Sequence, residues 1–287
     1  MWTQPATQQT RKQFSTVSCI SALCLLLMPQ AVSGQATEVA PVKHLKSPFD
    51  FAARSDEKHP LQPVMHVMRG VLDHIDQQVH DYSCTLIKRE RLDDELGERQ
   101  HIFMKVRQQP FSVYMHFLQP HKDREVLYVA GMNDGDLIAL DGGWKRKIMA
   151  PVSLDPEGML AMSGQKYPIT SVGMRNLCEE YLKTLEEDIQ YSECEVDINP
   201  NSRIGGRSAT LIQVMHPTPR KAFRSHISRI FLDNELRVPV HFDAFLWPAE
   251  ANGTPPLEES YTYTNLKINQ GFTSKDFDKE NPDIFKQ

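Results

Sequence analysis

Histidine is the residue type most often used in metal and acid–base chemistry, and the chain holds eleven histidines. No His-Glu-x-x-His sequence occurs, and the nearest helical pair, His66 and His74, is eight residues apart. Surface or hydrogen-bonded histidines explain that spacing better than a metal site does. Cys84, Cys178 and Cys194 also lack the short intervals of zinc ligands. We therefore expect neither a metal nor a cofactor.

Nucleophile and phosphate-binding motifs are missing as well. No Gly-x-Ser-x-Gly sequence occurs, and Cys178 has no histidine partner in a local motif. Gly142-Gly143 and Gly205-Gly206 are typical of hairpin turns, because neither pair joins a strand to the start of a helix. We therefore predict no catalytic residue and a protein that is not an enzyme.

Arg124 lies in a dense charged cluster, residues 121–125, between two predicted strands. An arginine guanidinium binds phosphate or carboxylate through two parallel hydrogen bonds, so Arg124 is a candidate contact for an anion. A solvated loop is the simpler interpretation, because exposed ion pairs contribute little to stability.

Apolar side chains form a methionine-rich stripe in two adjacent segments. The candidate cavity-lining residues are Ile102, Met104, Val106, Phe111, Val113, Met115 and Phe117. Packing in the core is the default function of such a stripe. Methionine is flexible and adapts to irregular surfaces, however, and twelve methionines in the chain would suit a cavity for acyl chains. We therefore expect the stripe to line a binding cavity.

Two helices and about ten or eleven strands must position these residues. Apolar residues recur at helical spacing over residues 61–79 and 171–188, and they alternate with a period of two elsewhere. The expected strands cover residues 82–86, 102–106, 111–117, 126–130, 136–140, 144–149, 192–198, 208–215, 226–232, 238–246 and 261–268. Prolines and glycines over residues 150–170 predict a long loop, and Phe272, Phe277 and Phe285 are expected to anchor a polar tail.

This pattern predicts a mainly β protein with some α structure (α+β). Open antiparallel sheets of so many strands curl or split, so the simplest arrangement is a strongly curved sheet wrapped around the two amphipathic helices.

The N-terminal region has the three parts of a secretory signal peptide. Arg11 and Lys12 precede the uncharged, leucine-rich stretch 14–28, and small residues follow Pro29. The stretch is too short for a membrane span of ~20 residues, and Leu23 before Cys24 fits a lipoprotein processing site badly. We predict a signal peptide over residues 1–36, a flexible leader over 37–60 and a β domain over 61–287. The mature protein would be exported to the periplasm or cell envelope, without a transmembrane span.

Charge and cysteine content narrow the range of partners. The formal net charge is −5, from 32 basic and 37 acidic residues, which argues against nucleic acid as a partner. In an oxidising compartment one disulfide among Cys84, Cys178 and Cys194 is possible, and its three pairings remain open, as does the presence of free thiols.

Four stretches carry a resemblance to a known family. They are residues 111–120 with 124–129, residues 153–158 with 167–170, residues 231–240, and residues 259–269 with 276–278. Over residues 60–287 the chain resembles an uncharacterised family of exported bacterial proteins, whose fold is similar to that of the lipoprotein-sorting proteins LolA and LolB and the sensor RseB.

The resemblance implies an incomplete β-barrel of the LolA-like kind, which holds lipid chains beneath a helical lid and catalyses no reaction. No functional residue of those proteins is carried over to a position here. We hypothesise a cell-envelope protein that binds a lipid or the acyl chains of a lipoprotein. The alternatives are a sensor or scaffold that recognises envelope proteins without lipid cargo, and an enzyme acting on envelope polymers, which would need a polar cleft with clustered carboxylates.

Overall fold

The computed structural model describes residues 47–51, 58–250 and 252–285. The predicted signal peptide and most of the predicted leader, including the expected cleavage site, lie outside these residues. Within them, no helix combines the length and apolar character needed to cross a bilayer. Phe49 and Phe51, which fall in the predicted leader, pack partly buried against the main core.

Antiparallel strands dominate the chain, and their apolar residues alternate as expected for sheets with one buried face. In chain order the helices and strands are α1 (Leu61–Gln78), β1 (Asp81–Leu92), β2 (Glu95–Leu96), β3 (Gln100–Arg107), β4 (Ser112–Gln119), β5 (Glu125–Val129), η1 (Asn133–Gly135), β6 (Leu137–Leu140), η2 (Gly143–Lys147), β7 (Val152–Leu154), α2 (Met159–Met162), η3 (Ile169–Ser171), α3 (Met174–Asp188), β8 (Glu195–Ile204), β9 (Arg207–Met215), β10 (Ile227–Asp233), β11 (Pro239–Phe245), β12 (Leu257–Ile268) and η4 (Ser274–Phe277).

All strands belong to one twelve-stranded sheet, in the order β7-β6-β5-β4-β3-β1-β12-β11-β10-β9-β8, with β2 paired to β1 alone. Among the described residues β7 and β8 have no second neighbour, so the sheet is not closed. The expected α+β fold with an incomplete barrel is confirmed. Ten of the eleven expected strands are present, and the short strands β2 and β7 bring the count to twelve.

The first and last long strands meet in the middle of the sheet. β1 pairs with β12 in antiparallel register, from Tyr82 opposite Ile268 to Glu90 opposite Glu259. On either side of this seam the strands follow one another along the chain, β3 to β7 on one side and β8 to β11 on the other.

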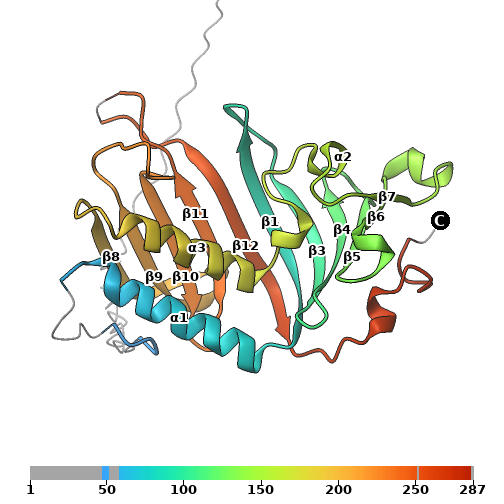
Figure 1. Ribbon diagram of the computed structural model, residues 1–287, viewed down its shortest axis with the longest axis horizontal. Coiled ribbons are helices and arrows are strands. Elements are labelled where there is room, and N and C mark those ends of the chain that lie inside the picture. Colours follow the sequence, from blue (N-terminus) through green and yellow to red (C-terminus); the bar gives the residue numbers. More distant parts are fainter. Residues whose placement is uncertain (1–46, 52–57, 251, 286–287) are drawn as a thin grey trace, which may run out of the picture. The chain divides into compact units, whose positions relative to one another are not determined.

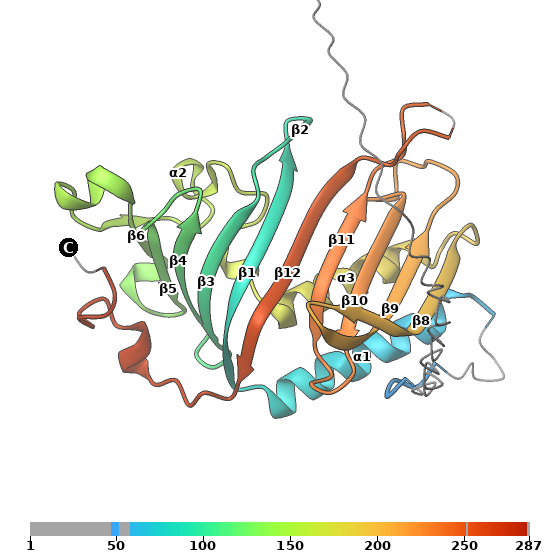
Figure 2. The same cartoon turned by 180° about the vertical axis from the view of Figure 1, so that it is seen from behind.

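The helices α1 and α3 lie side by side across the inner face of β8–β12 (Figure 1), while the opposite face of these strands carries neither of them (Figure 2). Apolar side chains of both helices interlock with those of the strands. Fully buried members of this core include Met68, Ile75, Leu185, Ile212 and Ile230. Both helix predictions are confirmed, with α3 beginning three residues later than expected.

Gly173 sets the start of α3. Its φ of 115° lies in the left-handed region, and a Cβ at this position would approach the Tyr82 hydroxyl oxygen to 3.0 Å. The same hydroxyl accepts a hydrogen bond of 3.0 Å from the backbone N–H of Met174, one of the N–H groups that a helix start leaves without an internal partner. Residues 169–171 therefore form a separate turn before the helix.

A buried polar pair lies at the end of α3. His216 Nε2 is 3.3 Å from Asp188 Oδ2, and both side chains are buried. The ring of His216 stacks on Phe223 at 4.0 Å between centroids. Burial raises the pKa of Asp188 to about 7, and burial lowers the pKa of His216.

The C-terminal tail covers the outer face of β4–β6 and forms a second, smaller core. Phe277 and Phe285 are buried there, and Phe272 packs partly buried beside them, which confirms the predicted anchors. The N–H of Phe285 donates a hydrogen bond of 2.6 Å to Glu125, which also pairs with Arg146 of η2 at 2.6 Å.

Two segments differ from their predictions. Residues 144–149 are not a strand, because Gly142 packs against the Lys122 carbonyl so closely that a Cβ would lie 2.0 Å from it, and the chain turns into η2. The predicted loop 150–170 contains β7 and α2. Cys84, Cys178 and Cys194, the cysteines of the described residues, are free thiols, and burial raises the pKa of Cys84 and Cys178.

Candidate functional site

A cavity of about 1040 Å³ lies against the inner face of the sheet where α1 does not reach. Residues 141–172 are here called the covering segment. They first form η2 and the edge strand β7, and from residue 155 on they run over the inner face of β1 and β3–β6, where they form the opposite wall together with α3. Ligand cavities of drug-sized molecules occupy about 300–1,000 Å³, so the volume is sufficient for a sizeable ligand.

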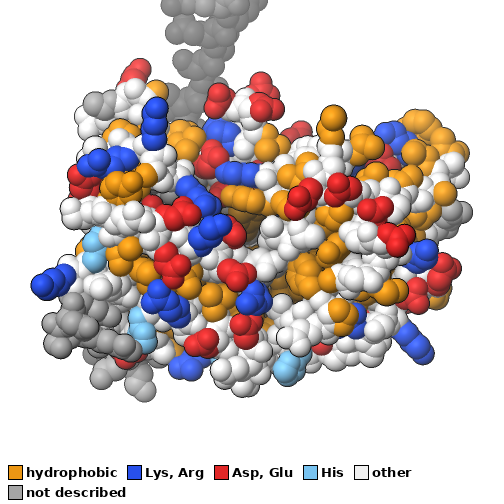
Figure 3. All heavy atoms as spheres, viewed as in Figure 1, with side chains coloured by type: hydrophobic (Ala, Val, Ile, Leu, Met, Phe, Trp, Pro, Cys, Tyr) orange, Lys and Arg blue, Asp and Glu red, His pale blue; other side chains and the backbone are white. Residues whose placement is uncertain are grey.

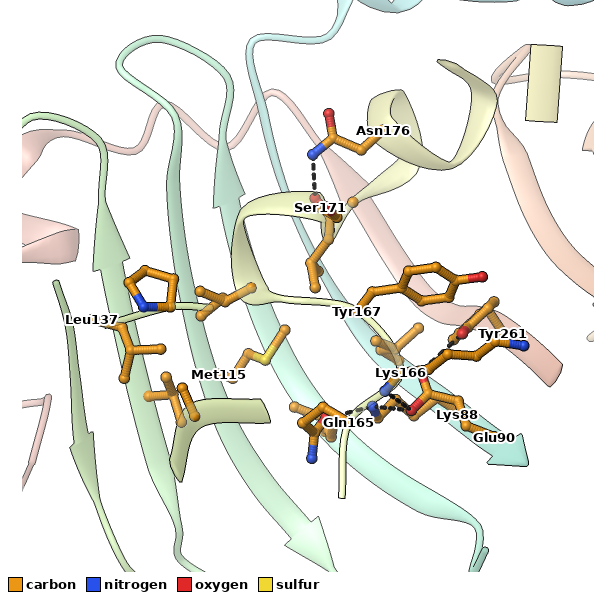
Figure 4. A pocket seen from close by; sticks show the side chains of 18 of the residues that line it. Lys88, Glu90, Met115, Leu137, Gln165, Lys166, Tyr167, Ser171, Asn176 and Tyr261 are labelled. Atoms are coloured by element: carbon orange, nitrogen blue, oxygen red, sulfur yellow. Dashed lines mark hydrogen bonds and ion pairs between the residues drawn. The ribbon is translucent and has the colours of Figure 1, made fainter. Parts of the chain in front are cut away.

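One end of the cavity is apolar. Alternation along the strands directs every second side chain inward, and Figure 4 shows Met115 and Leu137 together at this end. The strand residues of the apolar wall are Leu86, Ile102, Met115, Phe117, Val126, Leu137 and Ala139. Val152 and Leu154 of β7 pair with Ala139 and Leu137 and extend this wall, and Met149 also lines the cavity. The later part of the covering segment supplies the facing apolar residues Leu160, Ala161 and Ile169.

The methionine-rich stripe is divided between the cavity and the core. Ile102, Met115 and Phe117 line the cavity. The remaining residues of the stripe are Met104, Val106, Phe111 and Val113. Met104, Val106 and Val113 are buried in the main core. Phe111 is half-buried, and its ring centroid lies 6.2 Å from that of Tyr128. The division arises because the chain before α3 passes over one end of the strands, where a Cβ on Gly173 would contact Val106 at 4.0 Å.

Arg124 lines the cavity, and its guanidinium is engaged by the chain itself. Its Nε and Nη2 donate hydrogen bonds of 3.2 and 3.1 Å to one oxygen of Asp141, and its guanidinium carbon lies 5.8 Å from the Phe117 ring centroid. Hydrogen bonds from Lys145, Gly142 and Arg124 outweigh the effect of burial and lower the pKa of Asp141. The anion that Arg124 contacts in the structure is thus the chain's own Asp141, and contact with an anionic ligand stays a prediction.

The other end of the cavity carries a polar network that the sequence analysis missed (Figure 4). Its members are Lys88, Glu90, Gln165, Lys166, Tyr167, Glu258, Glu259 and Tyr261. In the part of the chain that the structure describes, no three histidine, cysteine or acidic side chains are grouped as metal ligands.

Lys88 and Glu90 form the buried centre of this network. Lys88 Nζ lies 2.9 Å from Glu90 and donates a hydrogen bond of 2.6 Å to the side-chain oxygen of Gln165. Glu90 also accepts hydrogen bonds from the Tyr261 hydroxyl at 2.8 Å and from the backbone N–H of Lys166 at 3.2 Å. These bonds tie the covering segment to β1 and β12.

Lys166 makes a second connection between the covering segment and the sheet. Its Nζ lies 2.5 Å from Glu258 and 3.2 Å from Glu259 on β12. Burial alone would lower the pKa of Lys166, but the two carboxylates outweigh it and the pKa is raised. Burial, followed by the charges of Glu259 and Glu90, raises the pKa of Tyr261, which keeps this hydroxyl protonated as a donor.

The polar network could have been found from the alternation of inward and outward side chains along β1. Tyr82, Cys84 and Leu86 point inward, and the same period places Lys88 and Glu90 on the inner face two and four residues later. Charged side chains on the buried phase of a strand are rare unless they are paired or functional.

Comparisons with known proteins give the following likenesses. No curated protein matches the chain. Three solved structures are similar in fold. A domain of an outer membrane lipoprotein-sorting protein from Vibrio parahaemolyticus is 10% identical over 75% of this chain and 96% of that chain, with a TM-score of 0.36. Lipoprotein LppX from Mycobacterium tuberculosis is 11% identical over 74% of this chain and 98% of that chain, with a TM-score of 0.42, and a LolA superfamily protein from Nitrosomonas europaea is 9% identical over 75% of this chain and 98% of that chain, with a TM-score of 0.31. At these identities and TM-scores, the likenesses carry no inference about function.

The family comparison covers most of the chain. Residues 79–285 match the family described as "Protein of unknown function (DUF1571)". This range contains all twelve strands and α3, and it begins directly after α1. The chain therefore belongs to the DUF1571 family.

Proposed function

We propose that the protein is a non-catalytic binding protein of the cell envelope, which holds a lipid or the acyl chains of a lipidated partner in its cavity. The observation that supports this proposal is the apolar end of the cavity, with its inward row of strand side chains facing a second apolar row from the covering segment. Each methylene group buried there would contribute about 0.8 kcal/mol.

The polar network favours binding over catalysis. Glu90, Glu258 and Glu259 are clustered carboxylates, as an enzyme acting on envelope polymers would need. Each of them, however, pairs with Lys88 or Lys166, and Glu90 also accepts a hydrogen bond from Tyr261. Carboxylates with such partners fasten the cavity wall, and in this proposal the network meets the polar end of the ligand.

Lipid carried through purification tests this proposal. The full sequence is expressed, the purified protein is extracted with organic solvent, and lipids are quantified by mass spectrometry. Met115→Trp fills the apolar end, so the amount of bound lipid is expected to fall about tenfold, the equivalent of about 1.4 kcal/mol. Met132→Trp is the matched control, because Met132 is 57% exposed and does not line the cavity.

The result against the proposal is equally definite. Wild-type protein that never carries lipid, or a Met115→Trp variant that carries as much lipid as Met132→Trp, would contradict it.

Export is part of the same proposal, and mass spectrometry of the purified chain is expected to find a mature N-terminus within or directly after residues 33–36. An intact N-terminus on protein from the envelope fraction would contradict the cleavage.

A further inference from the structure

Exposed apolar side chains are concentrated at one edge of the cavity. Nine large apolar residues of the described chain are exposed, and six of them fall within residues 144–160. This rim patch consists of Trp144, Ile148, Met149, Val152, Met159 and Leu160. Figure 3 shows apolar side chains gathered in the upper right of the view, over η2, β7 and α2. Contiguous apolar surface of this kind marks an interaction site in most soluble proteins.

The rim patch continues into the cavity. Met149, Val152 and Leu160 belong both to the exposed set and to the cavity lining. The other three residues extend outward from them, and Met159 is 89% exposed and Trp144 71% exposed. A surface that covers the rim patch would therefore also face the cavity.

Basic side chains surround Trp144. Lys145 and Lys147 of η2 are exposed, and Lys145 Nζ lies 3.1 Å from Asp141. Lys122 lies in the neighbouring loop, against whose backbone Gly142 packs. Residues 121–125 and 141–149 together hold five basic and three acidic side chains. The acidic Asp155 and Glu157 precede α2, so the basic excess is located at η2.

We infer that the rim patch docks the protein on an anionic lipid bilayer. Tryptophan and lysine on one short turn suit the interface of a membrane, where the indole ring lies among the head groups and the ammonium groups meet lipid phosphates. The η2 turn and the four-residue α2 are short and irregular, and they offer no long ridge or groove for a protein partner. Docking through this edge places the cavity against the bilayer.

Vesicle flotation tests this docking with protein that is expressed from the full sequence and purified after export. The probes are vesicles of phosphatidylcholine alone and of phosphatidylcholine mixed with phosphatidylglycerol. Wild-type protein is expected to float with the mixed vesicles, and Trp144→Ser with Ile148→Ser is expected to lower the bound fraction about tenfold. Met132→Ser is the matched control, because Met132 is exposed outside the rim patch. Lys145→Gln with Lys147→Gln is expected to abolish the preference for the mixed vesicles.

Tryptophan emission reports the contact directly. The chain has three tryptophans, so Trp2→Phe with Trp247→Phe leaves Trp144 as the reporter, and its emission is expected to shift to shorter wavelength with mixed vesicles. Circular dichroism of each variant checks that the fold is retained.

Two outcomes would overturn the inference. They are wild-type protein that floats with neither vesicle type, and a Trp144→Ser, Ile148→Ser variant that floats as well as Met132→Ser. Co-purification of a protein that shields the rim patch, without vesicle binding, would also assign this surface to a different partner. Lipid extraction from the same variants keeps the cavity's function separate, since the docking proposal does not require the cavity to be filled.

Discussion

The two halves of the sheet are covered in different ways. Over most of β8–β12, here called the filled half, the helices α1 and α3 pack into a core, whereas over β1 and β3–β6, the hollow half, the covering segment leaves a cavity of about 1040 Å³. The cavity also reaches Ser228, Phe242 and Tyr261 at the border of the filled half. A long helix presents apolar side chains in continuous rows that interlock with a sheet. The covering segment has Pro151, Pro156, Gly158 and Gly164, and it cannot form such rows.

One sheet thus combines a half that packs into a filled core with a half that encloses a cavity. The buried inner strand residues are mostly aliphatic in both, and methionine is among them only on β3 and β4. What differs is the element opposite them. The hollow half still gains stability from its outer face, where the C-terminal tail packs on β4–β6.

A matched pair of methionine truncations should give the largest difference between the halves. Met68 is fully buried in the filled half, so Met68→Ala leaves a new void and is expected to lower the free energy of unfolding by about 3 kcal/mol. Met115 faces the existing cavity, so Met115→Ala is expected to cost about 1 kcal/mol. Urea unfolding measures both values. Equal losses would mean that the cavity wall is packed as tightly as the core.

Asp188 should make the filled half sensitive to pH. Its folded pKa is raised to about 7, so between pH 4 and 7 the folded state binds more protons than the unfolded state and stability falls as pH rises. Asp188→Asn removes this loss and is expected to be more stable than wild type by about 2 kcal/mol at pH 8, with little difference at pH 4. His216, whose lowered pKa has the opposite effect, is present in both proteins.

Urea unfolding of wild type and Asp188→Asn at several pH values measures this difference. A difference that stays constant from pH 4 to pH 8 would show that Asp188 titrates normally in the folded protein, and that the filled half accommodates its charge.

Lys166 should give the smallest effect, confined to the hollow half. Lys166→Met removes the ion pairs with Glu258 and Glu259 and is expected to lower the free energy of unfolding by about 1 kcal/mol. Hydrogen exchange is expected to accelerate at the amides of residues 163–167 and to stay unchanged in α1. Lys183→Met, at an exposed position of α3, is the control. Equal exchange in both variants would show that the ion pairs of Lys166 do not hold the covering segment in place.

The regular elements were predictable because their side-chain periods are strong. Both long helices and most strands follow from repeated apolar positions, and the phenylalanine anchors of the tail follow from isolated aromatic residues in a polar stretch. The η2 turn was misassigned as a strand because Trp144, Ile148 and Met149 look like buried residues, whereas the structure exposes them.

The candidate site was only half predictable. Alternation identifies which stripe residues face inward, but it cannot tell Met104, which lies under other side chains, from Met115, which faces the cavity. That distinction depends on which distant segment covers each position. The polar network combines residues up to 171 positions apart, such as Glu90 and Tyr261, and no local pattern joins them.

The seam between β1 and β12 has a consequence for how the chain folds. Each side of the sheet grows by pairing neighbours in sequence, but the seam joins residues 82–90 to residues 259–268. Closing so long a loop is entropically costly, which makes it a slow step. The polar network spans the same seam, since Glu90 lies on β1 and Tyr261 on β12. The cavity therefore acquires its complete wall only after nearly the entire chain has been synthesised and β12 has paired with β1.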